Sequence, residues 1–187
     1  NQADDHVANI AAMLTSPAVE RYFPLLARRL LDVHGNSRGW RRNRLRTASM
    51  LTVDALGLDT AARGVKLEDQ RPDLLVFDDI DDEQDTPRAV EKKIATITKK
   101  LLPAGSDDAA VLAIQNLVHE DSIFARLADG RADFLRGRIV SGPIPAVEGL
   151  EVERRADGYR IVAGEATLEG MSLEVCQEKL DEWGLTA

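Results

Sequence analysis

A cluster of acidic side chains follows a short apolar run in the segment RPDLLVFDDIDDEQD, residues 71–85. Four apolar residues lead directly into Asp78 and Asp79, and four further acids follow within the next six positions. Like charges at this density repel one another, so the cluster is tolerable only if water solvates it or a cation neutralises part of it. Two carboxylates at the end of a strand can divide the work: one holds a metal ion, and the other takes a proton from water.

An apolar strand that ends in two acids has the form of a Walker B element of a nucleotide hydrolase. In such an element the first carboxylate holds the hydrated Mg²⁺ of the nucleotide, and the second orients or deprotonates the attacking water. Asp78 and Asp79 would have these two roles. The remaining acids would stay solvated in the loop and the first turn of the next helix, where negative charge suits the helix dipole: these are Asp81, Asp82, Glu83 and Asp85. Taken alone, the pattern favours the structural alternative of a strand leading into an acidic helix cap.

The elements around the acids alternate between helix and strand. The segment 73–78 is too apolar for a solvated face, so we expect a strand covered on both sides in a parallel sheet. Ligands gather at the carboxyl ends of parallel strands, which is where Asp78 and Asp79 fall. The sequence therefore predicts an α/β fold with a largely parallel sheet flanked by helices. The other predicted elements are helices over 2–14, from Ser16 and Pro17 through Leu30, from Thr86 and Pro87 through Leu101, through Ile123 to Leu127 and over 172–183, and strands over 48–56 and 109–116.

Composition excludes several classes of protein. The 187 residues are 44% hydrophobic and 30% charged, which is typical of a globular chain, and no apolar run approaches the length of a membrane span. The N-terminus has neither a signal peptide nor a starting Met, so we expect an intracellular protein cut from something longer. The three histidines lack metal-ligand spacing, which makes zinc a poor candidate. The single cysteine, Cys176, has the helical spacing of a core thiol.

Charge is distributed unevenly along the chain, whose formal net charge is -8. Residues 28–46 contain seven arginines and one acid, whereas residues 68–85 contain nine acids and one arginine. The arginine-rich stretch also holds Trp40, and together they could follow a phosphate backbone with a stacking ring. The alternative is that an arginine packs on Trp40 by a cation–π contact. The candidate DNA-binding residues are Arg38, Arg41, Arg42 and Arg44.

The order of the segments resembles the large terminase subunit of tailed bacteriophages, the motor that packages DNA into proheads. The resemblance is carried by GLDTAARGVKLEDQRPDLLVFDDIDD, residues 57–82, followed by AVLAIQNLVHEDSIFARL, residues 110–127. It extends from NQADDHVANI at 1–10 to SGPIPAVEGL at 141–150.

The resemblance implies a P-loop NTPase core of the ASCE-like kind, with ATP and Mg²⁺ as cofactors. Asp78 corresponds to the metal-ligating Walker B acid, and Asp79 to the catalytic carboxylate. Gln115 and Asn116 correspond to the motif that couples hydrolysis to movement. Arg63 corresponds to the Arg-Gly step before the strand and could stabilise charge at the γ-phosphate; equally, it could pair with Asp59 or Glu68 in a structural loop.

Two departures from the family pattern matter. The catalytic position is often Glu in such motors, and Asp79 is one methylene shorter. No G-x-x-x-x-G-K-[ST] phosphate loop occurs in the 187 residues, and that loop is what chiefly holds the phosphates. In the family the loop lies upstream, and a nuclease domain lies downstream. We therefore expect a partial ATPase core at 1–142, the C-terminal part of the ATPase domain at 143–187, and no activity from this chain alone.

The implied partners are double-stranded DNA, a portal protein, a small terminase subunit and further copies of the chain in a homo-oligomeric ring, with no membrane. The implied location is the cytoplasm of the bacterial host. Two alternatives stay open: another P-loop ATPase such as a helicase-like remodeller, and a non-enzymatic prophage remnant or regulatory module that keeps the fold without turnover.

Overall fold

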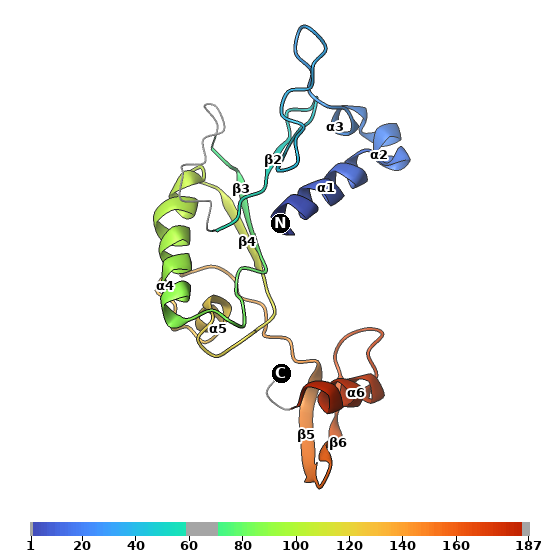
Figure 1. Ribbon diagram of the computed structural model, residues 1–187, viewed down its shortest axis with the longest axis vertical. Helices are drawn as coiled ribbons and strands as arrows, with labels where there is room; N and C mark the ends of the chain where they lie inside the picture. Colours follow the sequence, from blue (N-terminus) through green and yellow to red (C-terminus); the bar gives the residue numbers. More distant parts are fainter. Residues whose placement is uncertain (1, 59–70, 185–187) are drawn as a thin grey trace. The chain divides into compact units, whose positions relative to one another are not determined.

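The computed structural model describes residues 2–58 and 71–184 and has a mixed α/β fold (Figure 1). Its strands form three two-stranded sheets, β1–β2, β3–β4 and β5–β6. The α/β prediction is confirmed at this level. The prediction of a largely parallel sheet is not, because within the described ranges only β3 and β4 are parallel. The chain divides into two compact units: Asn1–Leu75 with Ala95–Ala110, and Val76–Ile94 with Val111–Ala187. The predicted boundary between 142 and 143 stays a prediction.

The N-terminal helix is α1, Gln2–Leu14, as its apolar spacing predicts. The single helix expected from Pro17 to Leu30 is wrong: α2 spans Pro17–Tyr22 and α3 spans Pro24–Ala27. Phe23 separates them with φ -135° and ψ 60°. A proline disfavours helical backbone in the residue before it, so Pro24 sets this break.

Two short antiparallel strands follow in the first unit. β1, Arg44–Arg46, pairs with β2, Thr52–Asp54, so that Leu45 lies opposite Val53. The strand expected over 48–56 is shorter because a turn occupies its first half, where the N–H of Met50 donates to the Thr47 carbonyl and Met50 has φ 70°. Val7 and Leu45 are buried and provide the apolar core of this unit.

The parallel pair consists of β3, Leu74–Asp78, and β4, Ala110–Ile114, both as predicted. The N–H of Ala110 donates to the carbonyl of Asp73, and the N–H of Asp79 donates to that of Ile114, so both strands advance in the same direction. Between them lie α4, Pro87–Thr96, a π-helical turn, Ile97–Leu101, and a 3₁₀ turn, Leu102–Ala104. The predicted apolar face of this helical segment is confirmed, since Val90 and Ile97 are almost completely buried.

One face of the parallel pair is open to solvent. Successive residues of a strand point to opposite faces, and in β3 Phe77 is buried while Val76 on the other face is 53% exposed. In β4, Leu112 and Ile114 are 49% and 55% exposed. The expectation that both faces are covered is therefore wrong for the described part of the chain, because no element in it packs on this second face.

A β-hairpin and a helix form the C-terminal part (Figure 1). β5, Val147–Arg155, pairs antiparallel with β6, Gly158–Ala166, and α6 spans Leu173–Trp183. Gln177 of α6 attaches the helix to β6: its Oε1 accepts the N–H of Ile161 at 2.7 Å, and its Nε2 donates to the Tyr159 carbonyl at 2.9 Å. The side-chain amide thus satisfies backbone groups on the edge of β6. Cys176 is buried, as expected of a core thiol.

No helix within residues 2–58 and 71–184 has the length and apolar character needed to cross a membrane.

Candidate carboxylate site

Asp78 and Asp79 lie at the carboxyl end of the parallel pair. Asp78 is the last residue of β3, and both acids are exposed. The N–H of Asp79 donates to the carbonyl of Ile114, the last residue of β4, at 3.3 Å. This hydrogen bond holds Asp79 beside the end of β4, where the sequence predicts that a ligand site should form.

The backbone of Asp79 has an unusual conformation. Its φ is 46°, in the left-handed region that residues with a Cβ adopt rarely. Aspartate tolerates this region better than most residues, and such conformations cost roughly 1 kcal/mol or more and cluster at functional sites. The sharp turn ends the strand and begins the loop of residues 79–86, named the acidic loop below. No periodicity in the sequence indicates this turn.

Gln115 reaches the acidic loop from the end of β4. It is half-buried, and its side-chain Oε1 accepts the N–H of Asp81 at 3.1 Å. Asn116, the second residue of the predicted coupling motif, is exposed. The structure therefore brings Gln115 to the loop that carries Asp79 and leaves Asn116 at the surface.

Asp81 is buried, with 7% of its surface exposed. Its Oδ1 accepts the N–H of Ile123 at 2.9 Å, and its Oδ2 accepts the N–H of Phe124 at 3.0 Å. Ile123 and Phe124 are the first two residues of α5, Ile123–Ala128, whose N–H groups have no partner within the helix. The expectation that Asp81 stays solvated is wrong, because these two N–H groups and the helix dipole compensate its charge.

Asp85 is also drawn into local structure. Its side chain forms an ion pair with Lys93 of α4 and accepts the N–H of Asp82 at 3.0 Å. Lys93 additionally donates to the carbonyl of Ile80 at 2.8 Å. The expectation that Asp85 stays solvated is therefore wrong as well, whereas Asp82 and Glu83 are exposed as expected. Part of the repulsion in the cluster is thus relieved by a lysine and by helix N–H groups.

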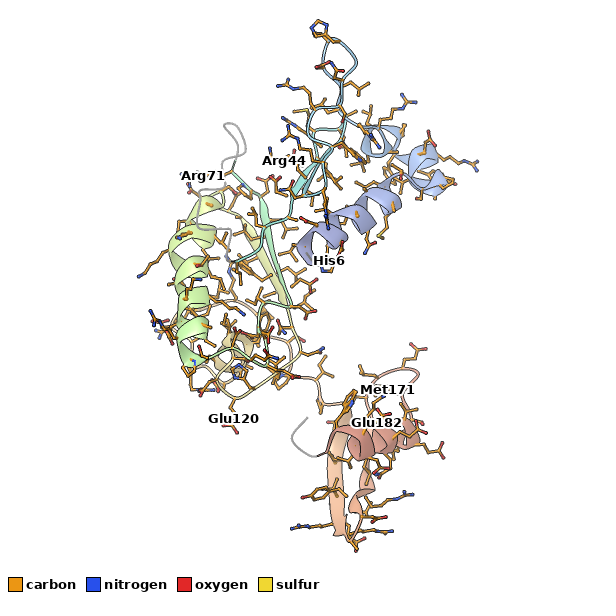
Figure 2. All side chains as sticks on the ribbon, in the orientation of Figure 1. His6, Arg44, Arg71, Glu120, Met171 and Glu182 are labelled. Atoms are coloured by element: carbon orange, nitrogen blue, oxygen red, sulfur yellow. The ribbon has the colours of Figure 1, made fainter. Side chains whose placement is uncertain are left out.

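The segment between β4 and the end of α5 is held by Arg131. Its guanidinium bonds to Asp129 at 2.7 Å, to Asp121 at 2.9 Å and to the carbonyl of Glu120, which Figure 2 labels. The backbone N–H of Arg131, followed by its guanidinium, lowers the pKa of the Asp129 carboxyl. In return, the hydrogen bonds to Asp129 and Asp121 raise the pKa of Arg131. Within α5, Arg126 pairs with Glu91 of α4 at 2.6 Å.

The donor set fits magnesium better than zinc. No group of three or more His, Cys, Asp or Glu side chains able to hold a metal occurs in the part of the chain that the structure describes. Mg²⁺ at nucleotide sites keeps several waters and is held by one or two carboxylates together with phosphate oxygens. An exposed carboxylate at a strand end, such as that of Asp78, meets this requirement.

The arginine-rich stretch folds in the first unit, and acids outside the stretch engage two of its members. Arg44 on β1, labelled in Figure 2, makes a bidentate ion pair with Asp54 of β2, and Arg42 lies 3.3 Å from Asp4 of α1. Arg38, Arg41 and Arg42 are exposed, whereas Arg44 is half-buried. The guanidinium of Arg29 lies 4.9 Å from the centroid of the Trp40 ring. The cation–π alternative for Trp40 is therefore confirmed. Arg63 lies outside the described residues.

The comparisons with known proteins give no match. Neither a protein-family model, nor a curated protein, nor a solved structure is significantly similar to this chain. Function therefore has to be argued from the motifs and from the geometry of the described residues.

Proposed function

We propose that this chain is the ATPase segment of a phage terminase large subunit, which couples ATP hydrolysis to translocation of double-stranded DNA into proheads. The observation that supports the proposal most strongly is the meeting of its two motifs. The strand that ends in Asp78 and Asp79 pairs in parallel with the strand that ends before Gln115, and Gln115 bonds to the loop after Asp79. In a P-loop NTPase these two motifs have to lie together at the carboxyl ends of neighbouring strands.

In this proposal Asp78 is the ligand that holds hydrated Mg²⁺, and Asp79 orients or deprotonates the attacking water. The metal ion, when bound, neutralises charge that develops on the phosphate oxygens. Asp79 suits the base because its carboxylate is exposed beside Asp78 at the strand end. Asp81 does not suit it, since both of its oxygens already accept helix N–H groups.

Gln115 links the two strand ends through the backbone of the acidic loop. A change at the carboxylates could therefore be passed to the segment after β4, which is the role we assign to Gln115 and Asn116. Arg63 stays a proposed charge-stabilising residue.

The phosphate-binding half of the site has to come from outside these 187 residues, because the sequence lacks the glycine- and lysine-bearing loop. The exposed arginines Arg38, Arg41 and Arg42 form the proposed DNA-facing surface, whereas Arg44 is paired with Asp54. The proposed partners are a portal protein, a small terminase subunit and further copies of the chain, in the cytoplasm of the bacterial host.

Steady-state phosphate release tests the proposal in the 187-residue chain and in the chain extended upstream of Asn1 to include a phosphate loop. We expect turnover only in the extended chain. Turnover by the short chain would mean that the phosphate site is misplaced. A silent extended chain that binds Mg-ATP would favour the non-enzymatic module. Turnover in a protein whose downstream sequence encodes no nuclease would favour a helicase-like remodeller.

A further inference from the structure

Asp81 makes the longest-range polar connection of the acidic loop. Its two carboxylate oxygens bond to the N–H groups of Ile123 and Phe124, 42 and 43 residues further along the chain. It is buried, so these bonds are formed away from bulk water, where charge-assisted hydrogen bonds are strong. Cutting them would leave a buried carboxylate or buried N–H groups unsatisfied, which costs more than breaking an exposed bond does.

The helix already has a cap of its own. Ser122 is completely buried at the N-cap position of α5, and its Oγ accepts the N–H of Ala125 at 3.2 Å. Ser122 and Asp81 thus serve different donors of the same first turn. Ser122 belongs to the helical segment itself, whereas Asp81 belongs to the acidic loop, so Asp81 is the cap that connects that loop to α5.

Three hydrogen bonds surround Asp79 in space and sequence. The N–H of Asp79 donates to Ile114, the N–H of Asp81 donates to Gln115, and the carboxylate of Asp81 accepts from α5. Asp79, between these fixed points, has the left-handed conformation that an L-residue adopts only when its surroundings hold it there. The bonds of Asp81 fix the chain on the far side of this strained turn.

We propose that Asp81 is a positioning residue, which locks the acidic loop to the first turn of α5 and thereby holds Asp79 at the end of β3. Its consequence for catalysis rests on the proposed function above. Its structural part, the restraint on the backbone of Asp79, does not depend on ATP hydrolysis and can be measured without nucleotide.

Asp81→Asn is the informative variant. The side chain keeps its shape, but its amide nitrogen then faces an N–H donor where an oxygen accepted before. Ser122→Ala is the matched control, because it removes a cap from the same helix turn without touching the acidic loop. Amide hydrogen exchange read by NMR gives the protection of Asp79 and Ile123. In the extended chain that includes a phosphate loop, kcat and KM for Mg-ATP are measured for the same variants.

We expect Asp81→Asn to lower the protection of the Asp79 amide about tenfold or more, while Ser122→Ala leaves that amide unchanged and affects only α5. In the extended chain, Asp81→Asn should reduce kcat about tenfold or more without raising KM, since the substitution affects the placement of the base rather than nucleotide binding. Ser122→Ala should leave kcat unchanged.

Unchanged protection of Asp79 in Asp81→Asn would overturn the proposal, and so would reduced protection with unaltered kcat. Reduced protection in an extended chain that has no ATPase activity would instead refute the proposed function and leave the structural restraint standing. If Asp81→Asn fails to fold, Gln115→Ala replaces it in the exchange experiment, because it removes the neighbouring tether of the loop and spares the helix cap. Unchanged protection of Asp79 in that variant would equally count against the restraint.

Discussion

The side-chain oxygen of Gln115 accepts the backbone N–H of Asp81 at 3.1 Å, which joins the end of β4 to the acidic loop that follows β3. Gln115 comes directly after its strand, and Asp81 comes three residues after the end of its own. A glutamine at this position does what a further strand residue could not do once the ladder has ended. It supplies an acceptor to a backbone donor that has left the sheet.

Gln115→Ala should lower the free energy of unfolding by about 1 kcal/mol, since it leaves the N–H of the buried Asp81 without this acceptor. The neighbouring substitution Asn116→Ala, at an exposed side chain, should change it by less than about 0.5 kcal/mol. Urea denaturation of the two variants measures the difference. Equal effects would mean that water replaces the glutamine at no cost.

Asp79→Gly should stabilise the fold by about 1 kcal/mol, although it removes the proposed base. The φ of 46° strains an aspartate and suits a glycine. Asp78→Gly, one residue earlier and inside β3, should destabilise the fold, because glycine weakens a strand. Chemical denaturation decides the sign for each. A destabilised Asp79→Gly would show that the side chain of Asp79 contributes more to folding than its backbone costs.

The Asp129 carboxyl should titrate below its ordinary range, with a pKa held down by Arg131. The stability that this group contributes is fully present above the unfolded pKa of about 3.9 and is lost as the pH falls through the lower folded pKa. Arg131→Gln should raise the pKa of Asp129 only part of the way, because the backbone N–H of residue 131, the larger cause, remains. Carboxyl ¹³C shifts followed against pH give both values. A full return to the ordinary pKa would assign the effect to the guanidinium instead.

Reversing Arg38, Arg41 and Arg42 to Glu should abolish binding of double-stranded DNA and flatten its salt dependence by about 0.9 in slope for each phosphate that the protein no longer neutralises. Arg44 is left intact because its pairing with Asp54 supports the β1–β2 hairpin. The matched control reverses three exposed arginines of the C-terminal hairpin, Arg154, Arg155 and Arg160, with the same change in net charge. Fluorescence anisotropy at several salt concentrations compares the two. Equal reductions in affinity would mean that only overall charge matters.

Most elements of the fold follow from local patterns in the sequence. α1, β3, α4, β4 and α6 carry strong apolar periodicity or continuous apolar runs, and the structure has them where predicted. Apolar spacing alone mispredicts a long helix after Ser16, because it ignores the effect of Pro24 on Phe23. The β5–β6 hairpin is not predicted, although Asp157 and Gly158 between alternating residues are a turn signal, because the flanking Gly and Pro residues indicate an irregular segment.

The site is predictable only in part. The apolar run before Asp78 indicates where the acids lie, because a strand end is a local property. The use of Asp81 as a cap for α5 depends on a hydrogen bond across 42 residues, and the spacing of acids within the loop does not indicate it. The same holds for Arg44, whose partner Asp54 lies on the opposing strand. Charge runs in a sequence show how many ions there are, and the fold decides which of them are paired.

The central claim is that Asp79 is the base of an ATPase whose phosphate loop lies outside this chain. The direct test is steady-state phosphate release, alongside Mg-ATP titration, for the extended chain and its Asp79→Asn variant, with the exposed Glu83→Gln of the same loop as control. We expect nearly unchanged Mg-ATP affinity and turnover reduced about 100-fold or more in Asp79→Asn, because the substitution removes the base and keeps its shape. Glu83→Gln should behave like the parent. Full activity in Asp79→Asn would contradict the claim.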